Sequence, residues 1–186
     1  MPRAPGASSL GCLPTADVEW KWGEMTSRSA YSDDEWGLLV GLPQSVMIAA
    51  SAAEDDGSRR TLSEGEAGLD AIAAGRESAN PLVRDVASEV VERVGGPEVG
   101  AETAIVPLPD RDAGLAEVLD RARGAAMLLT AKAPAGDAAA YKHWVVGIAE
   151  QVVGAARSGG FLGIGGEWVS ESERRFVDEL SAILND

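Results

Sequence analysis

The chain has 186 residues, of which 45% are hydrophobic and 25% charged, a composition typical of a globular protein with one sizeable core. Its formal net charge is −14, so its surface repels nucleic acids and anionic lipids, and we expect neither as a partner. No apolar run reaches the roughly 18 residues that a membrane-spanning helix needs. The only cysteine, Cys12, permits no internal disulfide, and the first residues lack the apolar stretch of a signal peptide. We therefore expect a cytoplasmic protein.

The N-terminal segment, residues 1–31, differs in composition from the rest of the chain. It is rich in proline, glycine and serine and shows no helical period. We expect residues 1–31 to form a mobile or loosely packed tail, and residues 32–186 to form a single helical domain. In the alternative interpretation the tail is ordered, because Trp20 and Trp22 pack on the domain.

The first predicted helix begins at Ser32, where Ser32 and Glu35 have the spacing of a capping box. Pro43 lies inside the helical pattern and removes one main-chain hydrogen bond, so we expect a kink or a split into two helices. Gly57 ends the segment. The residues that follow the apolar period of this helix are Trp36, Leu39, Val40, Val46, Met47, Ala50 and Ala53.

Two further helices are predicted in the next forty or so residues of the sequence. A second Ser-x-x-Glu pattern, from Ser63 to Glu66, is expected to open a short helix. Asn80 is a favourable N-cap and Pro81 suits the first helical position, so the following helix begins there. The glycines at residues 95–96 end it.

The second half of the chain contains three more predicted helices. Asp110 or Asp112 begins the fourth, Asp137 begins a long helix that runs to Arg157, and a capping box at Ser170–Glu173 opens the last. The apolar stripe of the long helix consists of Tyr141, Trp144, Val145, Ile148, Val152 and Ala155.

A weak internal repeat relates the two halves. Residues 38–57 match residues 144–163, and the Ser63 capping box then matches that of Ser170. Each unit is a long helix, a glycine-containing loop, a capping box and a shorter helix. The sequence therefore predicts an all-α bundle of about six helices, built from two pseudo-symmetric helix-loop-helix units.

The glycine-rich loop SGGFLGIGGEW resembles a phosphate cradle only superficially. Gly160 and Gly165 have Walker spacing, but Gly166 and Glu167 stand where the motif needs lysine and a hydroxyl residue. We expect the loop to reverse the chain direction and its apolar side chains to complete the core. In the alternative interpretation they dock a partner protein. These candidate docking residues are Phe161, Leu162, Ile164 and Trp168.

An acidic cluster follows the first predicted helix. Its members, Asp55, Asp56, Glu64 and Glu66, are the candidate ligands for calcium or another divalent cation at a helix-loop-helix junction. The spacing departs from a calcium EF-hand loop by one residue, and charge runs of this kind usually form a solvated surface. We expect no other cofactor.

The C-terminal segment GGFLGIGGEWVSESE, together with DEWGLLVGLPQSVMIAA near the start, resembles a family of uncharacterised bacterial proteins found in actinobacteria and cyanobacteria. More distantly, the pattern Asp56-Gly57 followed by Ser63 and Glu66 is similar to TerB-like tellurite-resistance domains. That resemblance implies an all-helical fold and a link to metal and stress responses.

Residues with catalytic potential are few. His143 is the single histidine, and it lies within a predicted helix next to Trp144, outside any nucleophile motif. We therefore expect a non-enzymatic, stress-related protein that acts through contacts with a protein partner or through self-association. The alternative is a binding module for a cation or a small ligand at the acidic junctions.

Overall fold

The computed structural model describes residues 28–53, 58–94, 110–158 and 170–186. Within these ranges the chain is helical and contains no strand, which confirms the prediction of an all-α bundle of about six helices. The helices are η1 (Arg28–Ala30), α1 (Asp33–Ala52), α2 (Ser58–Ala74), η2 (Gly75–Glu77), α3 (Pro81–Val94), α4 (Arg111–Lys132), α5 (Ala135–Ser158) and α6 (Glu171–Asn185).

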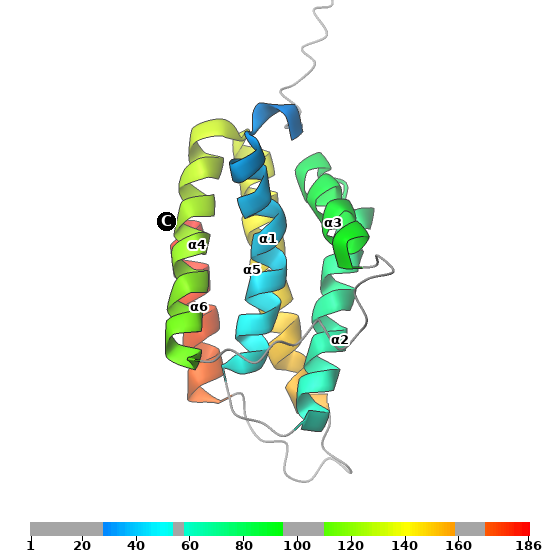
Figure 1. Cartoon of the computed structure of the whole chain (residues 1–186), viewed down its shortest axis with the longest axis vertical. Helices are drawn as coiled ribbons and strands as arrows, with labels where there is room; N and C mark the ends of the chain where they lie inside the picture. Colours follow the sequence, from blue (N-terminus) through cyan, green and yellow to red (C-terminus); the bar gives the residue numbers. More distant parts are fainter. Residues whose placement is uncertain (1–27, 54–57, 95–109, 159–169) are drawn as a thin grey trace, which may run out of the picture.

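Helices α1 and α5 form the centre of the bundle (Figure 1). Helices α4 and α6 lie on one side of this pair, and α2 and α3 lie on the other (Figure 1). All six helices contribute to one core, whose largest fully buried apolar side chains are Leu39, Leu42, Met47, Ile72, Leu82, Leu129, Tyr141, Ile148, Leu180 and Leu184. None of the helices in the described ranges is both long enough and apolar enough to cross a lipid bilayer.

The capping boxes predicted for the first and last helices are confirmed. At the start of α1 the Glu35 amide donates to the Ser32 hydroxyl (3.2 Å), and the Ser32 amide donates to the Glu35 carboxylate (2.8 Å). At the start of α6 the Glu173 amide likewise donates to the Ser170 hydroxyl (3.1 Å), and the Ser170 amide donates to the Glu173 carboxylate (2.9 Å). Both boxes satisfy main-chain donors that the first helical turn leaves without a partner.

The predicted starts of α3 and α4 are confirmed as well. The side chain of Asn80 accepts a hydrogen bond from the Val83 amide (3.2 Å), with Pro81 at the first helical position. Of the two alternatives for α4, Asp110 is the N-cap, and its carboxylate accepts from the Ala113 amide (3.0 Å).

The start predicted for the second helix is wrong. Helix α2 begins at Ser58, so Ser63 and Glu66 lie inside it and form no cap. A serine and a glutamate three residues apart share a face at any point of a helix, so this spacing alone does not mark a first turn. The match between the Ser63 and Ser170 boxes therefore does not extend to their structural roles.

Helix α5 begins two residues earlier than predicted, at Ala135. Asp137 lies in its first turn, where a negative charge favours the helix dipole. The amide group of Asn80 donates to the Asp137 carboxylate (2.8 Å), so the same side chain that caps α3 also holds the start of α5.

Helix α1 continues through Pro43 without being split, contrary to one of the two predicted outcomes. Proline has no N–H group for the carbonyl four residues earlier, which belongs to Leu39. The hydroxyl of Tyr141, on α5, donates to that carbonyl oxygen at 2.6 Å. A tertiary hydrogen bond thus replaces the helical one.

Helix α2 approaches α5 closely at the point where it becomes η2. A Cβ atom added at Gly75 would lie 2.8 Å from two ring carbons of Trp144 and 2.9 Å from the Cβ of Ala87. The indole N–H of Trp144 donates to the Ala71 carbonyl oxygen (3.3 Å) in the last turn of α2. Glycine is therefore required at position 75 to let the indole reach the end of α2.

Candidate functional site

The candidate site is an open hollow of about 590 Å³ between the start of α1 and the outer face of α3. Its lining residues are Arg28, Trp36, Asp85, Ser88, Glu89, Glu92 and Arg93. The five residues from α3 follow one another at helical spacings of three, one, three and one, so they form a single stripe along that helix. The sequence of α3 thus places its apolar residues in the core and this polar stripe in the hollow.

Tyr31 packs against the domain at one end of the hollow and Arg28 contacts Trp36, although the sequence pattern assigned both residues to the tail. Arg28–Ala30 form the short helix η1, and Tyr31 is 5% exposed, with its ring 5.9 Å from that of Trp36. The packed part of the chain therefore begins no later than Arg28. The prediction for residues 1–27, including Trp20 and Trp22, concerns residues outside the described ranges and stays a prediction.

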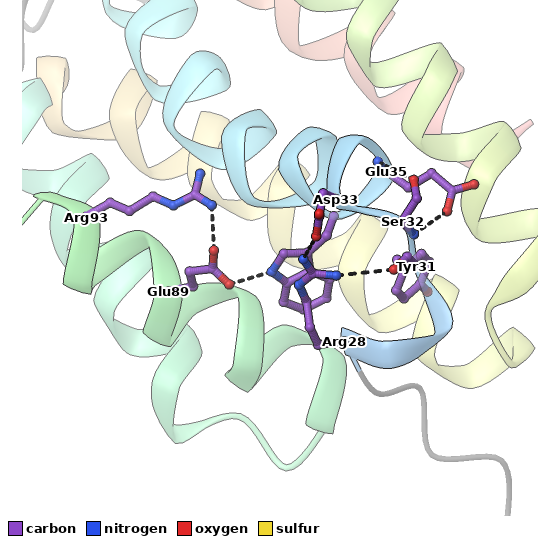
Figure 2. Close-up of polar contacts among 8 residues, drawn as sticks. Arg28, Tyr31, Ser32, Asp33, Glu35, Glu89 and Arg93 are labelled. Carbon is purple, nitrogen blue, oxygen red and sulfur yellow. Dashed lines mark hydrogen bonds and ion pairs between the residues drawn. The ribbon is translucent and has the colours of Figure 1, made fainter.

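Arg28 lies between the start of α1 and α3 (Figure 2). Its guanidinium carbon is 5.6 Å from the centre of the Trp36 ring, the geometry of a cation–π contact. The guanidinium also donates to the Tyr31 carbonyl oxygen (3.2 Å) and pairs with the Asp33 carboxylate. Arg28 thus closes one face of the indole.

Glu89 connects α3 to α1. Its carboxylate accepts a hydrogen bond from the indole N–H of Trp36 and pairs with the Arg93 guanidinium at 2.5 Å (Figure 2). Partial burial acts to raise the pKa of Glu89, but the hydrogen bond from Trp36 and the nearby charges of Arg93 and Arg28 outweigh it, so the pKa lies below its ordinary value. Glu89 is accordingly held as a carboxylate.

The hollow carries more negative than positive charge. Its titratable side chains are two arginines and three carboxylates. Glu89 is paired, whereas Asp85 and Glu92 are exposed and make no hydrogen bond or ion pair with the described residues. The hollow therefore combines an aromatic ring with carboxylates that are available to a cationic side chain.

A second polar group lies beside the hollow, where α1, α4 and α5 meet. Lys132 pairs with Glu35 at 2.6 Å, and this contact lowers the pKa of Glu35. The hydroxyl of Tyr31 is buried and has no hydrogen-bond partner among the described residues. Burial raises the pKa of Tyr31, and the charges of Asp137 and Glu35 raise it further.

The structure describes two of the four candidate cation ligands and does not bring them together. Glu64 is 2% exposed and accepts a hydrogen bond from the Ser51 hydroxyl (2.9 Å), whereas Glu66 is exposed on another side of α2. Asp55 and Asp56 lie outside the described residues. The described ranges hold no group of three or more potential metal ligands. A cation site at this junction stays a prediction.

The candidate docking residues of the glycine loop, Phe161, Leu162, Ile164 and Trp168, also lie outside the described residues, and their docking role stays a prediction. His143 is exposed on α5.

No protein-family model, curated protein sequence or solved structure matches this chain. The resemblances to the bacterial family and to TerB-like domains therefore stay predictions. The hollow itself is the basis on which a function can be assigned.

Sequence reasoning missed this hollow. A polar face of α3 could have been predicted, because the start of α3 was predicted correctly. Asp85, Glu89 and Glu92 lie at spacings of four and three residues and so share one face of the helix. Trp36 follows the apolar period of α1, so the sequence pattern identifies it only as a core residue. The pattern does not predict that its indole N–H donates a hydrogen bond to Glu89. The contact between Trp36 and Glu89 joins residues 53 positions apart, so no local pattern predicts it.

Proposed function

We propose that this chain is a cytoplasmic, non-enzymatic helical module that binds a segment of a partner protein in the hollow between η1–α1 and α3. The observation that carries this proposal is the presence of two carboxylates, Asp85 and Glu92, that flank the Trp36–Glu89 contact and make no ion pair with the described residues. A role in a stress response rests on the TerB-like resemblance alone.

The composition of the hollow supports protein binding. Tryptophan and arginine are the residue types most enriched among those that dominate the binding energy of protein interfaces, and Trp36 and Arg93 both line it. Their polar atoms are already held by Glu89. A preorganised surface of this kind loses little side-chain entropy when a partner binds.

The charge of the chain indicates which partners are favoured. With a net charge of −14, the protein attracts positively charged segments and repels acidic ones at long range. Asp85 and Glu92 place part of that negative charge at the hollow itself. We therefore propose a partner segment that carries lysine or arginine side chains.

The test compares proteins that the full chain retains from extracts of its source cells. A double variant, Asp85→Asn with Glu92→Gln, removes two charges from the hollow without breaking a contact among the described residues. The matched control, Glu117→Gln with Glu179→Gln, removes two exposed charges from α4 and α6. We expect the wild type and the control to retain a common partner and the hollow variant to lose it.

The same retained proteins for all three chains would contradict the proposal. Equal melting temperatures of the variants, measured by circular dichroism, ensure that a loss of binding does not reflect a loss of folding.

A further inference from the structure

Arg28 shows which chemical group the hollow accommodates. Its guanidinium carbon lies over the Trp36 ring, 5.6 Å from the ring centre, while its N–H groups bond a main-chain carbonyl and a carboxylate. Arginine is suited to this combination because its guanidinium stacks on aromatic rings and presents several donors in one plane. With Arg28 in place, Trp36 is only 3% exposed.

The attachment of Arg28 is weak enough to be reversed. Its side chain is 44% exposed, and its partner Asp33 is 94% exposed, so solvent screens the ion pair between them. Residues 28–30 are exposed, and the buried anchor of the segment is Tyr31. The Arg28 side chain can therefore leave the indole by rotation about its own bonds while Tyr31 stays in place.

We infer that the hollow is an arginine-recognition site, in which the guanidinium of a partner's arginine replaces that of Arg28 over Trp36. This inference rests on the proposed function. The incoming arginine also lies near Asp85 and Glu92, which have no ion-pair partner in the described part of the chain. Arg28 thus acts as an internal competitor that covers the ring until a partner arrives.

The experiment titrates the full chain with a blocked peptide, acetyl-Gly-Arg-Gly-Arg-Gly-amide, and follows the indole N–H resonance of Trp36 by NMR. The Trp36→Phe variant assigns that resonance. Removing the competitor with Arg28→Ala is expected to tighten binding by about two- to fivefold, the factor that corresponds to one exposed cation–π contact. Arg28→Gln removes the guanidinium but keeps a polar, uncharged side chain, and it serves as a second variant in case Arg28→Ala folds poorly.

Two controls separate specific recognition of the guanidinium from general electrostatic attraction between the acidic protein and a cationic peptide. Arg111→Ala removes one exposed positive charge from the start of α4, far along the sequence from the hollow, and is expected to leave the affinity nearly unchanged. Peptides in which citrulline or lysine replaces arginine test the need for a guanidinium, and both are expected to bind more weakly.

The inference is overturned if neither Arg28 variant binds the arginine peptide more tightly than the wild type. It is also overturned if citrulline or lysine peptides shift the resonance as strongly. If such a result accompanies loss of a partner in the Asp85→Asn, Glu92→Gln variant, the proposed function stands and only the role of arginine fails.

Discussion

The hydroxyl of Tyr141 on α5 donates a hydrogen bond to the main-chain carbonyl oxygen of Leu39 on α1, at 2.6 Å. Leu39 is the residue whose carbonyl would pair with position 43 in a regular helix, and position 43 is proline. Both Leu39 and Tyr141 are fully buried, so this carbonyl has no access to water. An unpaired buried carbonyl is costly, and Tyr141 removes that cost.

Replacing Tyr141 with phenylalanine keeps the ring and removes the donor. We expect the Tyr141→Phe variant to lose about 1–3 kcal/mol of unfolding free energy, because the Leu39 carbonyl is then buried without its partner. In a Pro43→Ala background the new amide at position 43 can bond Leu39, so the loss is expected to shrink. Urea denaturation of the four proteins in this double-mutant cycle measures the coupling. Equal losses in both backgrounds would show that Tyr141 does not compensate for the proline.

Gly75 is expected to tolerate no larger residue. Alanine there places a Cβ within 3 Å of the Trp144 ring and of Ala87, so we expect Gly75→Ala to destabilise by about 1–3 kcal/mol through overpacking. Gly147, inside α5, provides the control, because a Cβ atom added there would meet no neighbouring group of the described residues within 4 Å. Gly147→Ala is expected to stabilise by about 0.5–1 kcal/mol. Thermal melts of both variants test these two expectations. A Gly75→Ala protein that melts at the wild-type temperature would contradict the close contact at position 75.

The lowered pKa of Glu89 predicts a specific acid response. A carboxylate whose folded pKa lies below its unfolded value stabilises the protein above the unfolded pKa, near 4.3, and this contribution is lost as the pH falls toward the folded value. We therefore expect the stability advantage of the wild type over Glu89→Gln to be present at neutral pH and to shrink below about pH 4.3. Melting temperatures measured from pH 7 to 3 test this, with Glu117→Gln as the exposed control. If the stability difference between the wild type and Glu89→Gln does not change with pH, the lowered pKa of Glu89 is contradicted.

Ser51 supports the buried carboxylate of Glu64. Ser51→Ala removes a donor from a side chain that is 2% exposed, and we expect a loss of about 1–3 kcal/mol of unfolding free energy. Ser45 lies on the same helix, but its hydroxyl bonds the Gly41 carbonyl of its own helix. Ser45→Ala is therefore expected to change stability much less. Similar losses for the two variants in chemical denaturation would mean that Glu64 does not depend on Ser51.

The sequence determined the features that depend on neighbouring residues. The caps at Ser32, Asn80 and Ser170 were predicted, and Asp110 was one of two predicted alternatives, because each cap satisfies main-chain donors within three residues of itself. The apolar period likewise identified the helices and the buried face of α5. The helix start predicted at Ser63 was wrong, because the same spacing of serine and glutamate also occurs inside a helix.

Only the tertiary structure decided how distant polar groups are paired. The continuity of α1 through Pro43 depends on Tyr141, which is 102 positions from the carbonyl that it bonds. The hollow depends on Arg28, which lies over the Trp36 ring, and on Glu89, which accepts a hydrogen bond from the indole N–H. Such pairs form because burial makes an unpaired polar atom costly, and the partner is whichever group the packing of the helices brings within reach.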